Sequence, residues 1–172
     1  IPVGYFKTMH NPKTDWCYKT EPDESMNNIS IRYPRGKTLG GSSSINGLLY
    51  IRGQNRDYDV WRQLGNTGWG WDDVLPYFIK AEDQERGKND FHGVNGPLAV
   101  SDQRIHLPLL DEFQNAAEEF GIPKTKDFNT GDNLGCGYFQ VTEKDGFRCS
   151  TSVGYLNPIK NRKNLEIITH AH

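Results

Sequence analysis

A glycine-rich segment followed by three serines is the part of this sequence best suited to hold a small molecule. Gly36, Gly40 and Gly41 lie close together, and residues 42–44 are all serine. Glycine lets the backbone approach a ligand closely because it has no Cβ. Serines at a helix start cap free N–H groups, and the remaining N–H groups with the positive end of the helix dipole attract anions. The pattern predicts a seat for a phosphate or an electron-rich ring, although the same residues are also ordinary turn formers.

Two well-known phosphate-binding motifs are absent. The P-loop requires a glycine five residues before its Gly-Lys-Thr, and Ile31 occupies that position before Gly36. The dinucleotide fingerprint Gly-x-Gly-x-x-Gly occurs nowhere in the chain. Any cofactor site in this segment is therefore of another kind.

The segment resembles the first sequence signature of the glucose–methanol–choline (GMC) flavoprotein oxidoreductases. The likeness rests on residues 35–47, with Tyr50, Arg52-Gly53 and Asp57-Tyr58-Asp59-x-Trp61 at matching distances. Further stretches are similar to the bacterial alcohol and choline dehydrogenase branch of the family: residues 68–78, 92–93, 96–98, 127–129, 135–142, 148–156 and 164–167. The resemblance covers essentially the whole chain.

The resemblance implies a mixed α/β fold, part of a GMC-type FAD-binding Rossmann-like domain and part of the substrate domain. We interpret residues 1–172 as the middle segment of a larger enzyme. Within it, residues 34–53 would form the FAD-contacting loop and helix, and 54–157 mostly cap or substrate-side elements. Residues 164–172 would form a strand returning to the FAD domain.

The family pattern also implies where the cofactor binds. Carried over position by position, the FAD contacts fall on Leu39, Gly40, Ser42, Asn46, Gly47, Leu48 and Leu49. Some family members bind FAD covalently through a histidine immediately before the asparagine. Ile45 occupies that position here, so we expect non-covalent FAD. The family's catalytic histidine lies outside this chain, and we assign no catalytic residue within it.

The function implied is oxidation of a primary alcohol, choline-like or another small alcohol, by hydride transfer to the flavin. Two alternatives remain open from the sequence: a non-catalytic flavin- or nucleotide-binding module, and a stand-alone interaction domain. The partners expected are the alcohol substrate and the remaining segments of the same enzyme.

Composition excludes several other classes. The formal charge of −2 has mixed signs throughout, which argues against nucleic-acid binding. No apolar run approaches the ~18 residues that a membrane span needs. Cys17, Cys136 and Cys149 fit neither a metal motif nor a disulfide framework, so we expect reduced thiols in a cytoplasmic protein.

The remaining histidines and tryptophans give weaker signals. His92 lies in a turn, where a histidine is usually a hydrogen-bonded surface or hinge residue. His170 and His172 would share a strand face, but without a third ligand nearby we expect no metal site. We expect the dispersed tryptophans to anchor loops, with Trp16 kept as a candidate wall of the flavin or substrate cavity.

Periodicity and turn residues predict the local elements. One helix should begin at Ser42 or Ser43 and run to about Ile51. Four further helices are expected: 57–64, one N-capped by Asp73, 108–120 with a core-facing apolar stripe, and 152–159. Strands are predicted at 98–100 and 138–142, a hairpin turn at 145–146, and a buried strand at 165–169.

Overall fold

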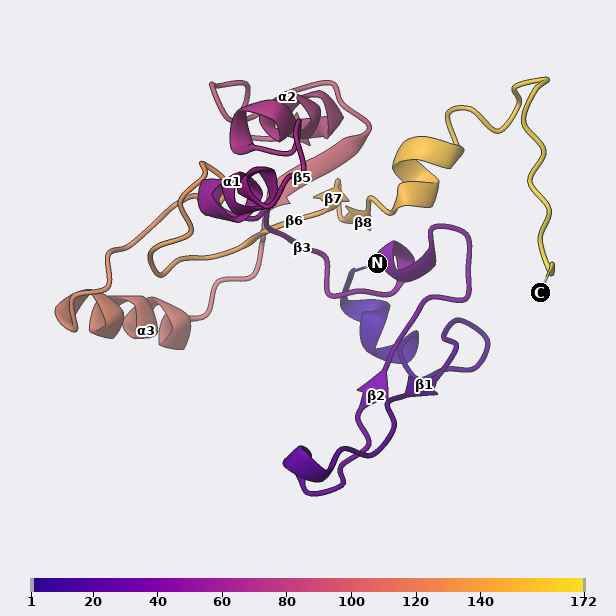
Figure 1. Cartoon of the computed structure of the whole chain (residues 1–172), viewed down its shortest axis with the longest axis horizontal. Coiled ribbons are helices and arrows are strands. Elements are labelled where there is room, and N and C mark those ends of the chain that lie inside the picture. The colour runs from indigo at the N-terminus through magenta and orange to yellow at the C-terminus, as the bar shows by residue number, and fades with distance from the viewer. Residues whose placement is uncertain (1, 172) are drawn as a thin grey trace. The chain divides into compact units, whose positions relative to one another are not determined.

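The computed structural model describes residues 2–171 and separates into two compact units. Unit 1 comprises residues 1–48 and 143–172, and unit 2 comprises residues 49–142. Both helices and strands are present, as expected for the predicted mixed α/β class (Figure 1). Residues 143–157 belong to unit 1, and the predicted grouping of 54–157 as cap or substrate-side elements stays a prediction.

Unit 2 is built on a four-stranded sheet of order β3-β6-β5-β4. The strands are β3 (Leu49–Tyr50), β6 (Gln140–Val141), β5 (Leu98–Asp102) and β4 (Glu82–Gln84). β4 and β5 are parallel, and the other two pairings are antiparallel. The strands predicted at 98–100 and 138–142 are therefore present as β5 and β6. Ala99 and Val100 of β5 are buried, together with Trp71 and Phe128, and form the apolar core.

Two helices of unit 2 pack side by side through aromatic rings. α1 spans Asn55–Gln63 and α2 spans Trp71–Ala81. The ring of Tyr58 in α1 lies 5.8 Å from Trp71 and 5.8 Å from Phe78 of α2. The sequence predicts α1 well, because its polar start and the glycine after it are local signals.

The start of α2 differs from the prediction. The helix begins at Trp71, and Gly70 occupies the N-cap position. Asp73 is the third helical residue, and its carboxylate accepts the Gly70 N–H at 2.9 Å. Pro76 consequently lies one turn further into the helix than expected. A carboxylate at this third position satisfies a free N–H as well as a true N-cap does, which explains the error.

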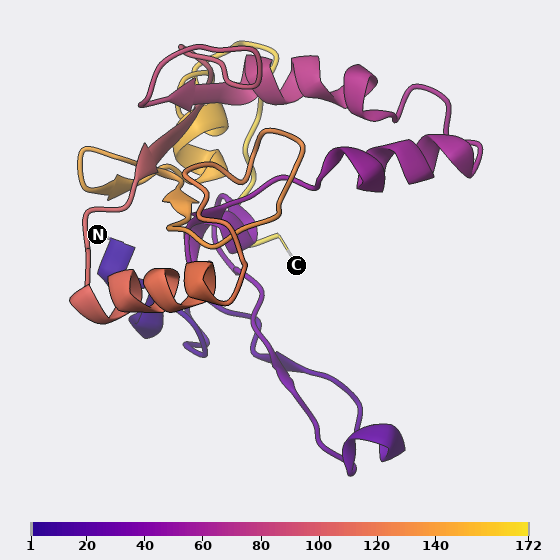
Figure 2. The same cartoon turned by 90° about the vertical axis from the view of Figure 1, so that its left-hand side faces the viewer.

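The third helix, α3, has the predicted bounds but not the predicted environment. It spans Pro108–Glu119, and Gly121 follows with a φ of 95°. Its apolar stripe is exposed rather than core-facing: Leu109 is 79 % exposed, Phe113 67 % and Phe120 86 %. In both views α3 lies apart from α1 and α2 (Figures 1 and 2). Periodicity identifies an apolar face but not what covers it, and no side chain of the described residues 2–171 buries this one.

Unit 1 consists of short elements joined by turns. It contains the 3₁₀ helices η1 (Pro2–Lys7), η2 (Glu24–Met26) and η3 (Gly41–Ser44), and the π-helical turn η4 (Ser152–Leu156). β1 (Tyr18–Lys19) and β2 (Arg32–Tyr33) form an antiparallel arm with η2 at its tip (Figure 2). β7 (Glu143–Lys144) and β8 (Phe147–Arg148) form the predicted hairpin, and both turn residues have positive φ, as a type I′ turn requires.

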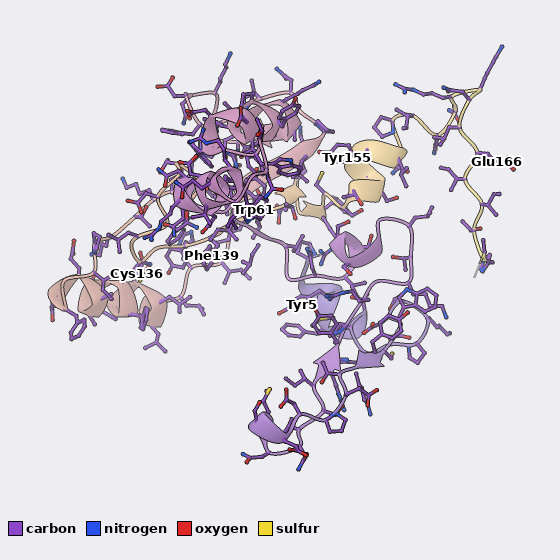
Figure 3. The ribbon with its side chains drawn as sticks, in the orientation of Figure 1. Tyr5, Trp61, Cys136, Phe139, Tyr155 and Glu166 are labelled. Atoms are coloured by element: carbon purple, nitrogen blue, oxygen red, sulfur yellow. The ribbon has the colours of Figure 1, made fainter. Side chains whose placement is uncertain are left out.

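Two elements predicted for unit 1 are wrong. The helix expected from Ser42 or Ser43 to Ile51 is replaced by the four-residue η3, and the chain then turns at Leu48, where φ is 71°. Residues 165–169 form no strand, and the ribbon around Glu166 carries no arrow (Figure 3). Ile168 is 70 % exposed. An isolated strand has no partner for its backbone groups, and the described residues offer none here. His172 lies outside the described residues.

Candidate functional site

The glycine-rich loop folds back on itself in unit 1. Gly40 and Gly41 have φ values of 87° and 54°, in the left-handed region that favours glycine. A Cβ on Gly36 would collide with the carbonyl of Gly41, because the two backbone stretches touch there. The glycines are thus required for the loop's own shape, independently of any ligand.

The serine side chains bond within the loop itself. Ser43 Oγ donates to the Gly40 carbonyl at 2.6 Å, and Ser44 Oγ donates to the Leu39 carbonyl at 2.8 Å. Ser42 Oγ accepts the Gly36 N–H at 3.2 Å, which leaves its own hydroxyl hydrogen for another acceptor. Only Ser42 of the three therefore retains a donor for a ligand, and a helix as short as η3 contributes little dipole.

A second segment, residues 148–151, supports the loop from more than 100 positions away in sequence. Arg148 Nη1 donates to the Ser43 carbonyl at 3.0 Å. The Thr151 N–H donates to Ser43 Oγ at 2.9 Å, and Thr151 Oγ1 donates to the Gly40 carbonyl at 3.2 Å. Arg148 and Thr151 belong to a stretch that resembles the family, residues 148–156. The local sequence pattern did not predict that they contact this loop.

A buried carboxylate fixes the approach to the loop. Asp15 is 1 % exposed and accepts backbone N–H groups from His10 at 2.7 Å, Cys17 at 3.0 Å and Arg35 at 2.9 Å. Burial alone would raise the pKa of Asp15, but these N–H donors outweigh it and hold the pKa below its usual value. Asp15 thereby joins residues 10–17 to Arg35, immediately before the first glycine of the loop.

The structure places six of the seven predicted FAD-contacting residues in one loop of unit 1. Asn46 and Gly47 are exposed, and Leu39 is half exposed. The Leu48 side chain is buried, so only its backbone can contact a ligand. The seventh residue, Leu49, is the first residue of unit 2.

The exposed part of the loop leaves open space beside two glycines. A Cβ at Gly47 or at Gly41 would meet nothing within 4 Å, so space is open beside both. Asn46 Nδ2 and the Ser42 hydroxyl supply donors at the same loop. A planar, electron-rich group that accepts hydrogen bonds suits this combination of open space and donors.

A second cluster, in unit 2, is a buried ionic network formed by Arg52, Glu82, His92 and Asp127. Arg52 Nη2 lies 2.9 Å from Glu82 Oε2, and His92 Nδ1 lies 2.9 Å from the same oxygen. His92 Nε2 lies 2.8 Å from Asp127 Oδ2. Arg52, Glu82 and His92 are each no more than 3 % exposed. The network joins the segment just before α1, strand β4 and two loops that are distant in sequence.

The network keeps His92 protonated. Burial alone would lower the pKa of His92, but its hydrogen bonds to Asp127 and Glu82, and their charges, raise the pKa to about 9. Two cations then balance two carboxylates, which is how a protein accommodates buried charge. The predicted hydrogen bonding of His92 is confirmed. Of the two positions expected for it, surface or hinge, the surface one is wrong because the residue is 1 % exposed.

The tryptophans make ring contacts with neighbouring aromatic residues. Trp61 and Trp69 pack edge to face with centroids 5.9 Å apart, as expected of loop anchors (Figure 3, Trp61). Trp16 stacks on Tyr18, and its expected role beside a cavity stays a prediction. Across the described part of the chain no three potential metal ligands cluster, and no helix is long and apolar enough to cross a membrane.

Comparison with known proteins identifies the family. The model of the GMC oxidoreductase family matches residues 16–172, and the chain belongs to this family. It is 42 % identical, over its whole length, to an alcohol dehydrogenase [acceptor] of Pseudomonas putida. It is 38 % identical, over 98 % of its length, to an oxygen-dependent choline dehydrogenase of Sinorhizobium medicae.

The fold agrees with this assignment. The crystal structure of pyridoxine 4-oxidase from Mesorbium loti superposes on 97 % of the chain with a TM-score of 0.91 and 30 % identity. The chain spans 31 % of each of the two dehydrogenases and 33 % of the oxidase. Membership of the family implies FAD as the cofactor.

Proposed function

We propose that this chain is part of an FAD-dependent oxidoreductase that oxidises an alcohol to a carbonyl compound. The observation that carries the proposal is the 42 % identity, over the whole chain, to an alcohol dehydrogenase. When bound, FAD supplies the hydride acceptor for the alcohol carbon. The alcohol hydroxyl also loses a proton in this reaction, and we assign its acceptor to a residue outside residues 1–172.

The contribution of this chain is to hold and orient the cofactor. The open space at Gly47 and the donors of Asn46 and Ser42 would face it. The half-exposed Leu39 and the neighbouring Gly40 would also contact the cofactor. Leu48 would contact it through its backbone, and Leu49 is the seventh residue predicted to contact it. These residues position a cofactor and move no proton.

The substrate proposed is a primary alcohol, choline-like or another small alcohol. The names of the two dehydrogenases support an alcohol substrate. Such alcohols should reduce the bound flavin under anaerobic conditions, and the matching acids should not. The reduction is measured as the loss of the flavin's visible absorbance. A flavin that stays oxidised with every alcohol tested would favour a non-catalytic binding module.

The cofactor is proposed to be bound without a covalent link at position 45. Ile45 carries no nucleophilic atom, and its side chain is only 3 % exposed. Acid or heat should therefore release FAD intact into the supernatant. Flavin fluorescence that remains with the precipitated protein would show a covalent link at another residue and would contradict non-covalent binding.

A further inference from the structure

The side-chain amide of Asn46 is held in one orientation by two donors. Its Oδ1 accepts the Leu48 N–H at 3.1 Å and Arg148 Nη1 at 2.6 Å. A guanidinium donates only, so the atom facing it must be the amide oxygen and not the nitrogen. The Nδ2 group then faces the other way, and no hydrogen bond from it is made within residues 2–171.

Arg148 holds the loop backbone as well as this side chain. Its Nη2 donates to the Asn46 carbonyl at 2.7 Å, and its Nη1 also reaches the Ser43 carbonyl. Three acceptors of one short loop therefore converge on one planar group, which a flexible lysine ammonium cannot reproduce. All of these atoms belong to unit 1.

The guanidinium is half-buried, and no carboxylate of the described residues forms an ion pair with it. A cation is costly to bury without a counter-charge, so its hydrogen bonds to the loop oxygens must offset part of that cost. Its burial lowers the pKa of Arg148, which is the expected result of missing compensation. The carbonyl and amide oxygens of the loop are its partners instead.

We propose that Arg148 is a positioning residue for the cofactor: it fixes the Asn46 amide with its oxygen inward, so that the loop presents Nδ2 as a hydrogen-bond donor. The ligand atom opposite Nδ2 must then be an acceptor, such as a carbonyl oxygen or ring nitrogen of the flavin. This inference rests on the proposed function, since it assumes that FAD occupies the loop.

The test compares four variants of the intact enzyme by titrating the apoprotein with FAD. Arg148→Met removes all three contacts, and Arg148→Lys keeps the charge with fewer donors. Asn46→Asp keeps an acceptor for Arg148 but replaces the outward donor by a carboxylate oxygen. Arg162→Met, an exposed arginine of unit 1, removes the same charge elsewhere and serves as the control.

We expect Arg148→Met and Asn46→Asp each to raise the Kd for FAD about tenfold or more, the scale of one charge-assisted hydrogen bond. Arg148→Lys should recover part of the loss, and Arg162→Met should match wild type. The bound flavin's visible spectrum and midpoint potential should shift in both loop variants, because its hydrogen bonding changes. A merely structural role would lower the melting temperature without changing the visible spectrum or the midpoint potential of the bound flavin.

Three results separate the possible failures. If wild-type protein takes up no FAD, the proposed function is wrong and the inference goes with it. If wild type binds FAD while Arg148→Met keeps its Kd, spectrum and potential, the inference alone is overturned. Should Arg148→Met not fold, Asn46→Asp decides, because unchanged binding and spectrum in that folded variant would exclude an outward donor at position 46.

Discussion

The imidazole Nε2 of His92 lies 2.8 Å from the carboxylate of Asp127, 35 residues further along the chain. The other ring nitrogen meets Glu82 at 2.9 Å, so both nitrogens donate and the ring is an imidazolium. Glu82 also pairs with Arg52 and accepts the Gly93 N–H at 3.2 Å. The loop that carries His92 is thus attached to β4 of unit 2 by charged hydrogen bonds as well as by the backbone bond from Gln84 N–H to the Gly93 carbonyl.

Stability should fall as pH rises through the alkaline range. The pKa of His92 is raised from 6.5 to about 9 in the folded protein, so its stabilising charge is fully present below pH 6.5 and is lost as the pH approaches 9. A shift of this size corresponds to roughly 3 kcal/mol in the free energy of unfolding. Urea unfolding at a series of pH values measures it. His92→Gln should remove most of the decline, and an equally steep decline in that variant would assign it to other groups.

Removing Arg52 should cost more than removing a neighbouring surface arginine. Arg52→Met leaves the buried Glu82 carboxylate short of a cation, and breaking such a pair typically costs about 3–5 kcal/mol. Arg56→Met, at an exposed position of α1, should stay within about 0.5 kcal/mol of wild type. The double variant Arg52→Met, Glu82→Gln should recover part of the loss, because it removes the uncompensated charge. Equal unfolding free energies for Arg52→Met and Arg56→Met would contradict the network's role.

The elements predicted well are those with signals close in sequence. α1, α3 and the turn at Asp145-Gly146 carry their own caps, periodicity or turn residues, and all three form where expected. Family likeness predicted a cofactor loop at residues 39–49 but not its internal hydrogen bonds. The cofactor contacts of this loop stay a prediction, whereas the secondary structure predicted for it was wrong.

The errors arise where distant residues decide the conformation. The helix expected after Ser42 does not form because Asn46 bonds the Leu48 N–H and Arg148, 102 residues away, takes the carbonyls that a helix would use. The ionic network escaped prediction for the same reason, since His92 and Asp127 meet only through the tertiary fold. The spacing of residues along the chain does not predict which distant residues, such as His92 and Asp127, will pair.

The exposed stripe on α3 should make residues 1–172, expressed alone, self-associate. Phe113 and Phe120 are 67 % and 86 % exposed, and contiguous apolar surface of this kind promotes association. Phe113→Glu should shift the sedimentation profile toward monomer. Asn115→Asp adds the same charge two residues away, where the helix faces elsewhere, and should not. A wild-type chain that stays monomeric at high concentration would show that the stripe is not an association surface.

Adding bulk at Gly47 should impair the enzyme through its cofactor. A Cβ at Gly47 meets nothing within 4 Å, so Gly47→Phe can fold, but its ring would occupy the space proposed for the flavin. A cofactor displaced by about 1 Å can lose on the order of 10²-fold in rate. Flavin content per protein and kcat per bound flavin, measured in the intact enzyme, test this expectation.

The control for that experiment must add equal bulk at an exposed position with ordinary backbone. Gly87 does not serve, because its φ of 92° would strain any larger residue there. Lys88, exposed in the same loop of unit 2, provides the control as Lys88→Phe, which should keep both flavin content and rate. If Gly47→Phe and Lys88→Phe bind the same amount of flavin and turn over equally fast, the space beside Gly47 is open solvent. The cofactor would then have to lie elsewhere on the enzyme.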